Sequence, residues 1–189
     1  AKCNFTMGPD GKMYSRMLGG NLVRIDVENA RGENLTNGDL VGTKDGSAYG
    51  LVFDPQDENV FYFSNNDKHC IYKYDLRTKE CACWAGQEGK SGYLDGPIGQ
   101  AMFNKPGQMC VDSEGNIILT DTENHCIRKI TMSTGYVSTL AGKPQNSGYV
   151  NGSAEDAQFK KPLGICIDND DVMYIGDSEN RAIRRLAVE

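Results

Sequence analysis

The chain has 189 residues, and 20 Lys and Arg stand against 26 Asp and Glu, for a formal net charge of -6 at pH 7. This acidic balance excludes a uniformly basic surface, so we expect no nucleic-acid partner. No apolar run approaches the roughly 18 residues of a membrane-spanning helix, and we expect no membrane span. The 22 glycines against 6 prolines favour many short strands joined by turns, which predicts an all-β protein.

A repeat of 56 residues organises the sequence. Residues 69–106 and 125–162 align without a gap and are identical at 15 of 38 positions. The repeat continues at both ends, so we divide the chain, as a single domain, into units at about 1–47, 48–105, 106–161 and 162–189, the last one incomplete. A period of this length indicates a solenoid or a propeller.

The strands follow in chain order within each unit. In the first unit, residues 5–8 and 12–15 match the start of the fourth unit. The third unit shows strands at about 109–111, 117–120, 126–131 and 136–140, separated by polar or Gly-containing turns. Four antiparallel strands per unit predict a β-propeller of four-stranded blades. About four blades and 15 strands are visible, and the fourth blade ends after its third strand.

Long loops connect the units. In the loop of about 20 residues that precedes the fourth unit, residues 153–159 predict one capped helical turn with Phe159 folded inward. Tyr93 and Asp95 in one loop, and Tyr149 and Asn151 in the next, are the candidate ligand-binding residues. An aromatic ring beside a carboxylate or carboxamide can stack on and hydrogen-bond a sugar or a peptide. The alternative is that each Gly-Tyr-x-x-Gly segment fastens its loop to the next blade.

Histidines and aspartates recur at equivalent positions. His69 and His125, with Asp121 and Asp177, are the residues that a metal site in the propeller channel would use. The fourth unit has Arg181 at the histidine position, which favours a structural role in a turn. We therefore assign no catalytic residue, no metal ligand and no cofactor, with a divalent metal at these four residues as the alternative.

The cysteines and arginines have simpler interpretations. Seven cysteines cannot form a complete set of intrachain disulfides. Cys70 and Cys126 occupy equivalent positions, and Cys110 and Cys166 nearly do, which indicates small buried hydrophobic residues. Arg128 and Arg184 alternate with apolar residues on third strands, so we expect both to line blade faces or face solvent.

The third and fourth units resemble NHL repeats. They share P-x-G-hydrophobic-x-x-D, then D-x-x-N-x-x-I-R-K, seen at residues 121–129 and, with small changes, at 162–168 and 177–185. The A-G, G-Y-x-D-G and A-x-F segments within residues 85–103 resemble bacterial envelope proteins that combine NHL repeats with an immunoglobulin-like (IPT/TIG) domain. The resemblance implies a propeller of six blades, and so a longer propeller of which this chain is a part. Missing blades, from the parent chain or another copy, would then cover the open sheet edges.

Two functions remain in view. The first is a non-catalytic binding or scaffold module that presents its inter-blade loops to a protein, peptide or glycan, because each polar motif repeats and no nucleophile-base-acid set stands apart. The second, implied by related propellers, is a metal-dependent lyase or lactone hydrolase with its site in the central channel. The resemblance implies an extracellular or cell-envelope location, while unpaired thiols leave a cytoplasmic one open.

Overall fold

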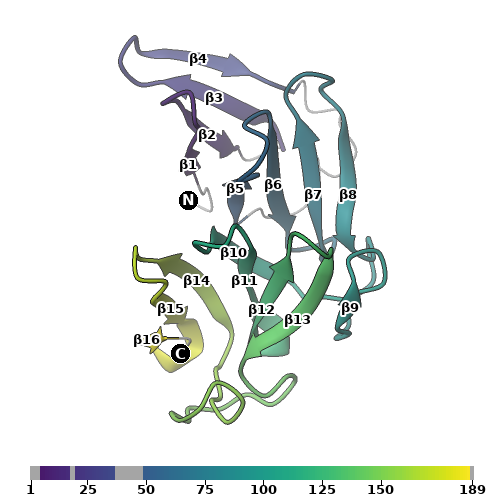
Figure 1. Ribbon diagram of the computed structural model, residues 1–189, viewed down its shortest axis with the longest axis vertical. Coiled ribbons are helices and arrows are strands. Elements are labelled where there is room, and N and C mark those ends of the chain that lie inside the picture. Colours follow the sequence, from purple (N-terminus) through teal and green to yellow (C-terminus); the bar gives the residue numbers. More distant parts are fainter. Residues whose placement is uncertain (1–4, 18–19, 37–48, 188–189) are drawn as a thin grey trace.

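The computed structural model describes residues 5–17, 20–36 and 49–187. These residues form four antiparallel sheets that follow one another in chain order around an arc (Figure 1). The predicted all-β class and the arrangement of antiparallel blades are confirmed. Within the described ranges the only helical segments are two short 3-10 turns, Thr122–Asn124 and Ser178–Asn180.

The strands of each blade run in sequence from the inner side of the arc outward (Figure 1). Blade one contains β1 (Phe5–Met7), β2 (Met13–Arg16), β3 (Leu22–Asp26) and β4 (Arg31–Asn34). Blade two contains β5 (Leu51–Phe53), β6 (Val60–Asn65), β7 (Cys70–Asp75) and β8 (Cys81–Gly86). Blade three contains β10 (Pro106–Val111), β11 (Ile117–Asp121), β12 (Cys126–Thr131) and β13 (Tyr136–Ala141). Blade four contains β14 (Pro162–Ile167), β15 (Met173–Asp177) and β16 (Ala182–Leu186).

The hydrophobic core is divided into layers between successive blades. On β6, Phe61 and Phe63 pack toward blade one, whereas Val60 and Tyr62 pack toward blade three. On β11, Ile118 joins the layer shared with blade four, while its neighbours in sequence join the layer shared with blade two. Because successive strand residues point to opposite faces, a strand between two other blades must be apolar on both.

The long inter-blade loops complete these layers. Phe103 and Phe159, from the two loops, are 0% and 2% exposed and belong to the core. The Ser153 hydroxyl accepts a hydrogen bond from the Asp156 amide, and the Ala157 amide bonds the Ser153 carbonyl, so this segment makes a single turn. The inward position of Phe159 predicted from the sequence is therefore confirmed.

One loop also adds a strand to the blade that follows it. The short strand β9 (Gly96–Pro97) lies in the loop that leaves blade two, and it pairs with β13 at the outer edge of blade three. Within the loop itself, Leu94 and Met102 form an isolated antiparallel bridge. The outer edge of blade three is therefore paired.

Blade four has an uncovered face. Ile71 and Ile127 are 0% exposed, but the equivalent Ile183 is 75% exposed. Cys166 is likewise exposed and Cys110 only half-buried, so the expectation that both are buried was wrong, whereas Cys70 and Cys126 are 0% exposed. The cause for Cys166 is its place on the last described blade, which no further sheet covers.

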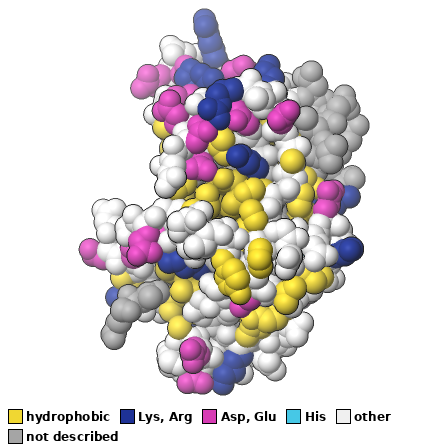
Figure 2. Space-filling model, turned by 45° about the vertical axis from the view of Figure 1, so that its right-hand side comes forward, with side chains coloured by type: hydrophobic (Ala, Val, Ile, Leu, Met, Phe, Trp, Pro, Cys, Tyr) yellow, Lys and Arg dark blue, Asp and Glu magenta, His cyan; other side chains and the backbone are white. Residues whose placement is uncertain are grey.

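The surface mixes apolar and charged regions. On the face drawn in Figure 2, hydrophobic side chains gather in a band across the middle, and charged side chains of both signs lie mainly toward the two ends. Among the residues that the structure describes, no helix has the length and apolar character required to cross a bilayer.

Candidate functional site: two buried arginine clusters and an axial pocket

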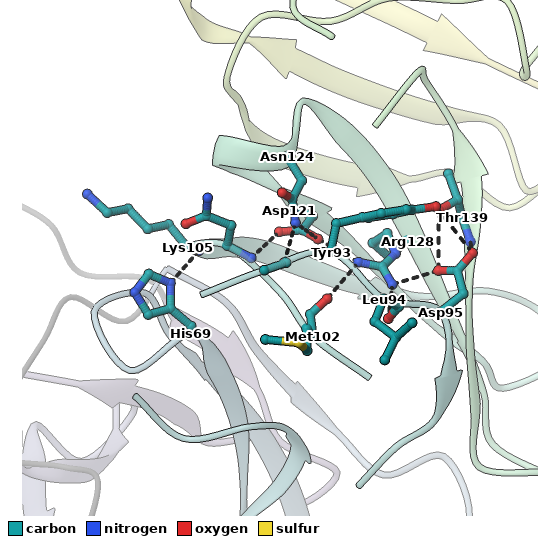
Figure 3. A network of polar contacts seen from close by, with 12 residues as sticks. His69, Tyr93, Leu94, Asp95, Met102, Lys105, Asp121, Asn124, Arg128 and Thr139 are labelled. Carbon is teal, nitrogen blue, oxygen red and sulfur yellow. Dashed lines mark hydrogen bonds and ion pairs between the residues drawn. The ribbon is translucent and has the colours of Figure 1, made fainter. Parts of the chain in front are cut away.

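Arg128 is the centre of a buried cluster of polar contacts. It lies on β12 with its side chain 0% exposed. Its guanidinium carbon is 4.9 Å from the centroid of the Tyr93 ring and 5.1 Å from that of Phe103, so the group lies between two aromatic rings. Figure 3 shows Tyr93 beside Arg128. Such contacts are favourable for a desolvated cation.

Carboxylates and carbonyls complete the Arg128 cluster, which we define as Arg128, Asp121, Tyr93, Asp95 and Phe103. Arg128 Nη1 is 2.6 Å from Asp121 Oδ2, and Nη2 is 2.6 Å from Asp95 Oδ1. The same guanidinium donates hydrogen bonds to the backbone carbonyls of Leu94 and Met102, at 2.9 and 3.1 Å (Figure 3). Arg128 therefore holds both sides of the loop between blades two and three.

Thr139, on the fourth strand of blade three, also bonds this loop. The Tyr93 hydroxyl is 2.8 Å from Thr139 Oγ1, and Asp95 accepts a hydrogen bond from the Thr139 amide at 3.1 Å. Both candidate ligand-binding residues of this loop thus contact the protein itself. The geometry matches the fastening role that the sequence left as the alternative.

The electrostatics of the Arg128 cluster reflect its burial. Complete burial raises the pKa of Asp121 to about 6, against the lowering effect of Arg128 and of its hydrogen-bond donors. Burial lowers the pKa of Arg128, but Asp121 and Asp95 outweigh this effect and the pKa is raised overall. At neutral pH the pair is therefore ionised and forms a buried salt bridge.

Blade four repeats this arrangement in a less complete form. Arg184 lies between Tyr149 and Phe159, at 4.9 Å from each ring centroid, and its Nη1 is 2.9 Å from Asp177. Asn151 takes the position of Asp95 and is exposed, and Tyr149 is 60% exposed. This Arg184 cluster leaves Tyr149 and Asn151 more accessible to a partner than Tyr93 and Asp95 are.

Asp121 and Asp177 also anchor the ends of the loops. They accept hydrogen bonds from the backbone amides of Asn104 and Lys160, at 2.8 and 2.7 Å. Each aspartate is 0% exposed and also bonds an asparagine three residues later. Their geometry is that of structural acceptors.

His69 and His125 occupy left-handed turns. Their φ angles are 56° and 58°, and Arg181 at the equivalent position has 53°. His69 Nδ1 accepts a hydrogen bond from the Lys105 amide at 3.1 Å, and His125 Nδ1 accepts one from the Lys161 amide at 3.2 Å. Burial, together with the charge of Lys105, lowers the pKa of His69.

The donor set does not fit a divalent metal. Across the described ranges, no group of three or more His, Cys, Asp or Glu side chains is arranged to hold an ion. A hollow of about 630 Å³ along the inner strands β1, β5, β10 and β14 has mainly apolar walls. We therefore derive no metal-dependent step from these residues.

A second hollow, the axial pocket, lies where the turns after the second strands of three blades meet. Its volume is about 430 Å³. Equivalent positions of blades two, three and four line it: Asn66, Thr122 and Ser178, followed in sequence by Asp67, Glu123 and Glu179. Three acidic and three small polar side chains are thus brought together by the repeat.

The ends of the inter-blade loops supply lysines to the axial pocket. Lys105 and Lys161 both line it. Lys161 Nζ lies 3.3 Å from Glu123 and 3.1 Å from Glu179, bridging the carboxylates of two blades. These charges are partly exposed, so a polar ligand can exchange with them.

Sequence reasoning missed the role of Arg128 and Arg184. Both were expected on blade faces or in solvent, but they are buried at 0% and 7% exposure. Their loop partners are more than 25 residues away in sequence, so strand alternation carries no sign of them. The available signal was a joint recurrence at 56 residues: Tyr93 and Tyr149, Phe103 and Phe159, and Arg128 and Arg184.

Comparison with known proteins identifies the repeat. Residues 103–130 match the family model of the NHL repeat. The chain is also 30% identical over 152 residues to NHL repeat-containing protein 2 of Gallus gallus, covering 79% of this chain and 19% of the relative. The match to the family model and the likeness to this relative both support the NHL propeller expected from the sequence. The chain spans less than a fifth of the length of that relative.

Solved propellers share this architecture. The chain is 29% identical to an auxiliary nutrient binding protein from Bacteroides thetaiotaomicron, with a TM-score of 0.80 over 98% of this chain and 47% of that one. A streptogramin B lyase also matches, with a TM-score of 0.66 over 97% of this chain and 50% of that one, but at 14% identity. The second likeness shows the fold alone.

Proposed function

We propose that this chain is a non-catalytic binding segment of an NHL propeller, which holds a protein, peptide or glycan at its loops and axial pocket. One observation carries the proposal. The acids, histidines and arginines that a catalytic site would use are bonded to their own blade or to the adjoining inter-blade loop, whereas the axial pocket collects equivalent polar side chains from three blades. A surface of this kind offers hydrogen bonds without a reactive group.

The setting we propose is extracellular or in the cell envelope of a bacterium, with an IPT/TIG-type domain as a companion in the full protein. The likeness to the auxiliary nutrient binding protein of Bacteroides thetaiotaomicron supports the setting. The companion domain rests on the sequence segments within residues 85–103. A further blade would cover the face that exposes Ile183, because the equivalent residues of blades two and three are fully covered by the next blade.

Binding of the chain to defined oligosaccharides and short peptides on an array tests the proposal. Any hit is then titrated with two sets of variants. Glu123→Gln and Lys161→Met alter the axial pocket, and Tyr149→Ala with Asn151→Ala alters the exposed loop. We expect at least one set to raise the Kd about 10-fold, while Glu114→Gln, at a side chain that is 75% exposed and away from both regions, leaves it unchanged.

Each possible failure has a clear meaning. A ligand whose Kd is the same for both sets of variants binds elsewhere, and the location proposed here is then wrong. Turnover of a ligand by the wild-type chain contradicts the non-catalytic assignment.

A further inference from the structure

Blade two contains a pair of thiols on adjacent strands, and no other blade has such a pair among the residues that the structure describes. Cys70 begins β7 and is 0% exposed, and Cys83 lies on the neighbouring β8 and is half-buried. In blade three, the position of Cys70 is taken by Cys126 and that of Cys83 by Thr139. Cys126 is therefore a buried cysteine equivalent to Cys70, with a threonine where blade two has its second thiol.

The pairing of the two strands brings the thiols together. Cys70 lies opposite Gly86, Tyr72 lies opposite Cys83, and a β-bulge between Ile71 and Tyr72 shifts the register. Cys70 and Cys83 consequently point to the same face as diagonal neighbours. The Cys83 thiol donates to the Gly86 carbonyl, with 3.8 Å between sulfur and oxygen, and the two thiols are close enough to shift each other's pKa.

The two thiols differ in pKa because their surroundings differ. The neighbouring Cys70 thiol lowers the pKa of Cys83 despite its burial, whereas the Cys83 thiol together with burial raises the pKa of Cys70. The Glu88 carboxylate raises the pKa of both thiols, while the backbone of Glu88 lowers the pKa of Cys83 through a hydrogen bond. Cys83 is thus the more accessible and more acidic member, as the attacking thiol of a dithiol pair should be.

We propose that Cys70 and Cys83 form a redox-active pair that closes to a disulfide across β7 and β8. The oxidant is a low-molecular-weight disulfide such as oxidised glutathione. The Cys83 thiolate attacks one glutathione sulfur, and one reduced glutathione leaves as the mixed disulfide forms. Cys70 then loses its proton to solvent and attacks Cys83 Sγ, which releases the second glutathione. Two thiols are oxidised and one small disulfide is reduced.

A peptide map of the full chain tests this directly. The chain is equilibrated in glutathione buffers of graded ratio, acid-quenched, alkylated with N-ethylmaleimide in denaturant and digested with trypsin. We expect the peptide of residues 69–73 to be joined to that of residues 80–90, with two fewer alkylated cysteines per chain. Reduction with dithiothreitol should separate the two peptides.

Three variants assign the bond. Cys83→Ser should abolish the cross-link, and Cys81→Ser should retain it, because Cys81 lies in the same tryptic peptide as Cys83. Cys126→Ser, at the unpartnered position of blade three, should also retain it. The proposal is overturned by full alkylation of Cys70 and Cys83 under oxidising buffer, by a cross-link that needs Cys81, or by a stable glutathione adduct on Cys83. The map of the unsubstituted chain decides the first and third of these without any variant.

Discussion

Arg128 and Asp121 lie on adjacent strands of blade three with 2.6 Å between Nη1 and Oδ2, and neither side chain is exposed. The pair links the inner part of the blade to the loop that arrives from blade two, because Arg128 also bonds Asp95 and two loop carbonyls. A buried ion pair is sensitive to the loss of either member, since the remaining charge is left without a partner in a dry site.

Loss of Arg128 should therefore be costly. We expect Arg128→Met to lower the free energy of unfolding by about 3–5 kcal/mol, measured by urea denaturation, because Asp121 is left buried and unpaired. The double variant with Asp121→Asn should recover part of this loss. Arg185→Met, at an exposed position of blade four, should change stability by less than about 0.5 kcal/mol. Equal effects of the two arginine variants would contradict the importance of the Arg128 cluster.

Two equivalent isoleucines should respond differently to truncation. Ile127→Ala removes side-chain atoms from the layer between blades three and four, and we expect a loss of about 2–4 kcal/mol. Ile183→Ala, at a side chain that is 75% exposed, should change the free energy of unfolding by less than about 0.5 kcal/mol. A large loss for Ile183→Ala would indicate that its face is covered in solution, and sedimentation velocity on the same samples would show whether a second copy covers it.

His69 should make stability depend on pH. Its pKa is lowered below the unfolded value of 6.5, so the unfolded chain binds the proton more tightly than the folded chain. The stabilising contribution of neutral His69 is complete above pH 6.5 and is lost as the pH falls below that value. Urea titrations on both sides of this pH should show the fall. His69→Asn, which tolerates the left-handed turn, should make the dependence shallower. An unchanged slope in this variant would show that other groups cause the loss.

Gly142 is required by the turn that leaves blade three. Its φ is +99°, and a Cβ there would lie 3.0 Å from the His125 carbonyl oxygen and 3.0 Å from the Phe159 ring. We expect Gly142→Ala to destabilise the chain by about 1–3 kcal/mol in thermal or urea unfolding. Gly32→Ala is the control, because a Cβ at Gly32 meets nothing within 4 Å and its φ is not positive. Similar losses for both glycines would rule out the strain that we assign to Gly142.

The fold could be predicted from the sequence because the same four-stranded unit recurs along the chain. The strands predicted at residues 117–120 and 126–131 are found at Ile117–Asp121 and Cys126–Thr131, since each turn recurs at a fixed spacing with its own glycine or asparagine. The axial pocket and the Cys70–Cys83 pair were not accessible. The pocket gathers side chains from turns of three different blades, and the thiols meet only because a β-bulge shifts the register by one residue.

The strand β9 couples the opening of blade three to the segment that leaves blade two. It belongs to the segment that leaves blade two, yet its hydrogen bonds are made to β13, the outermost strand of blade three. Blade three therefore cannot open from its outer edge without first detaching the end of blade two. We infer that these two blades exchange their amide hydrogens as one cooperative unit, although each has a complete sheet of its own.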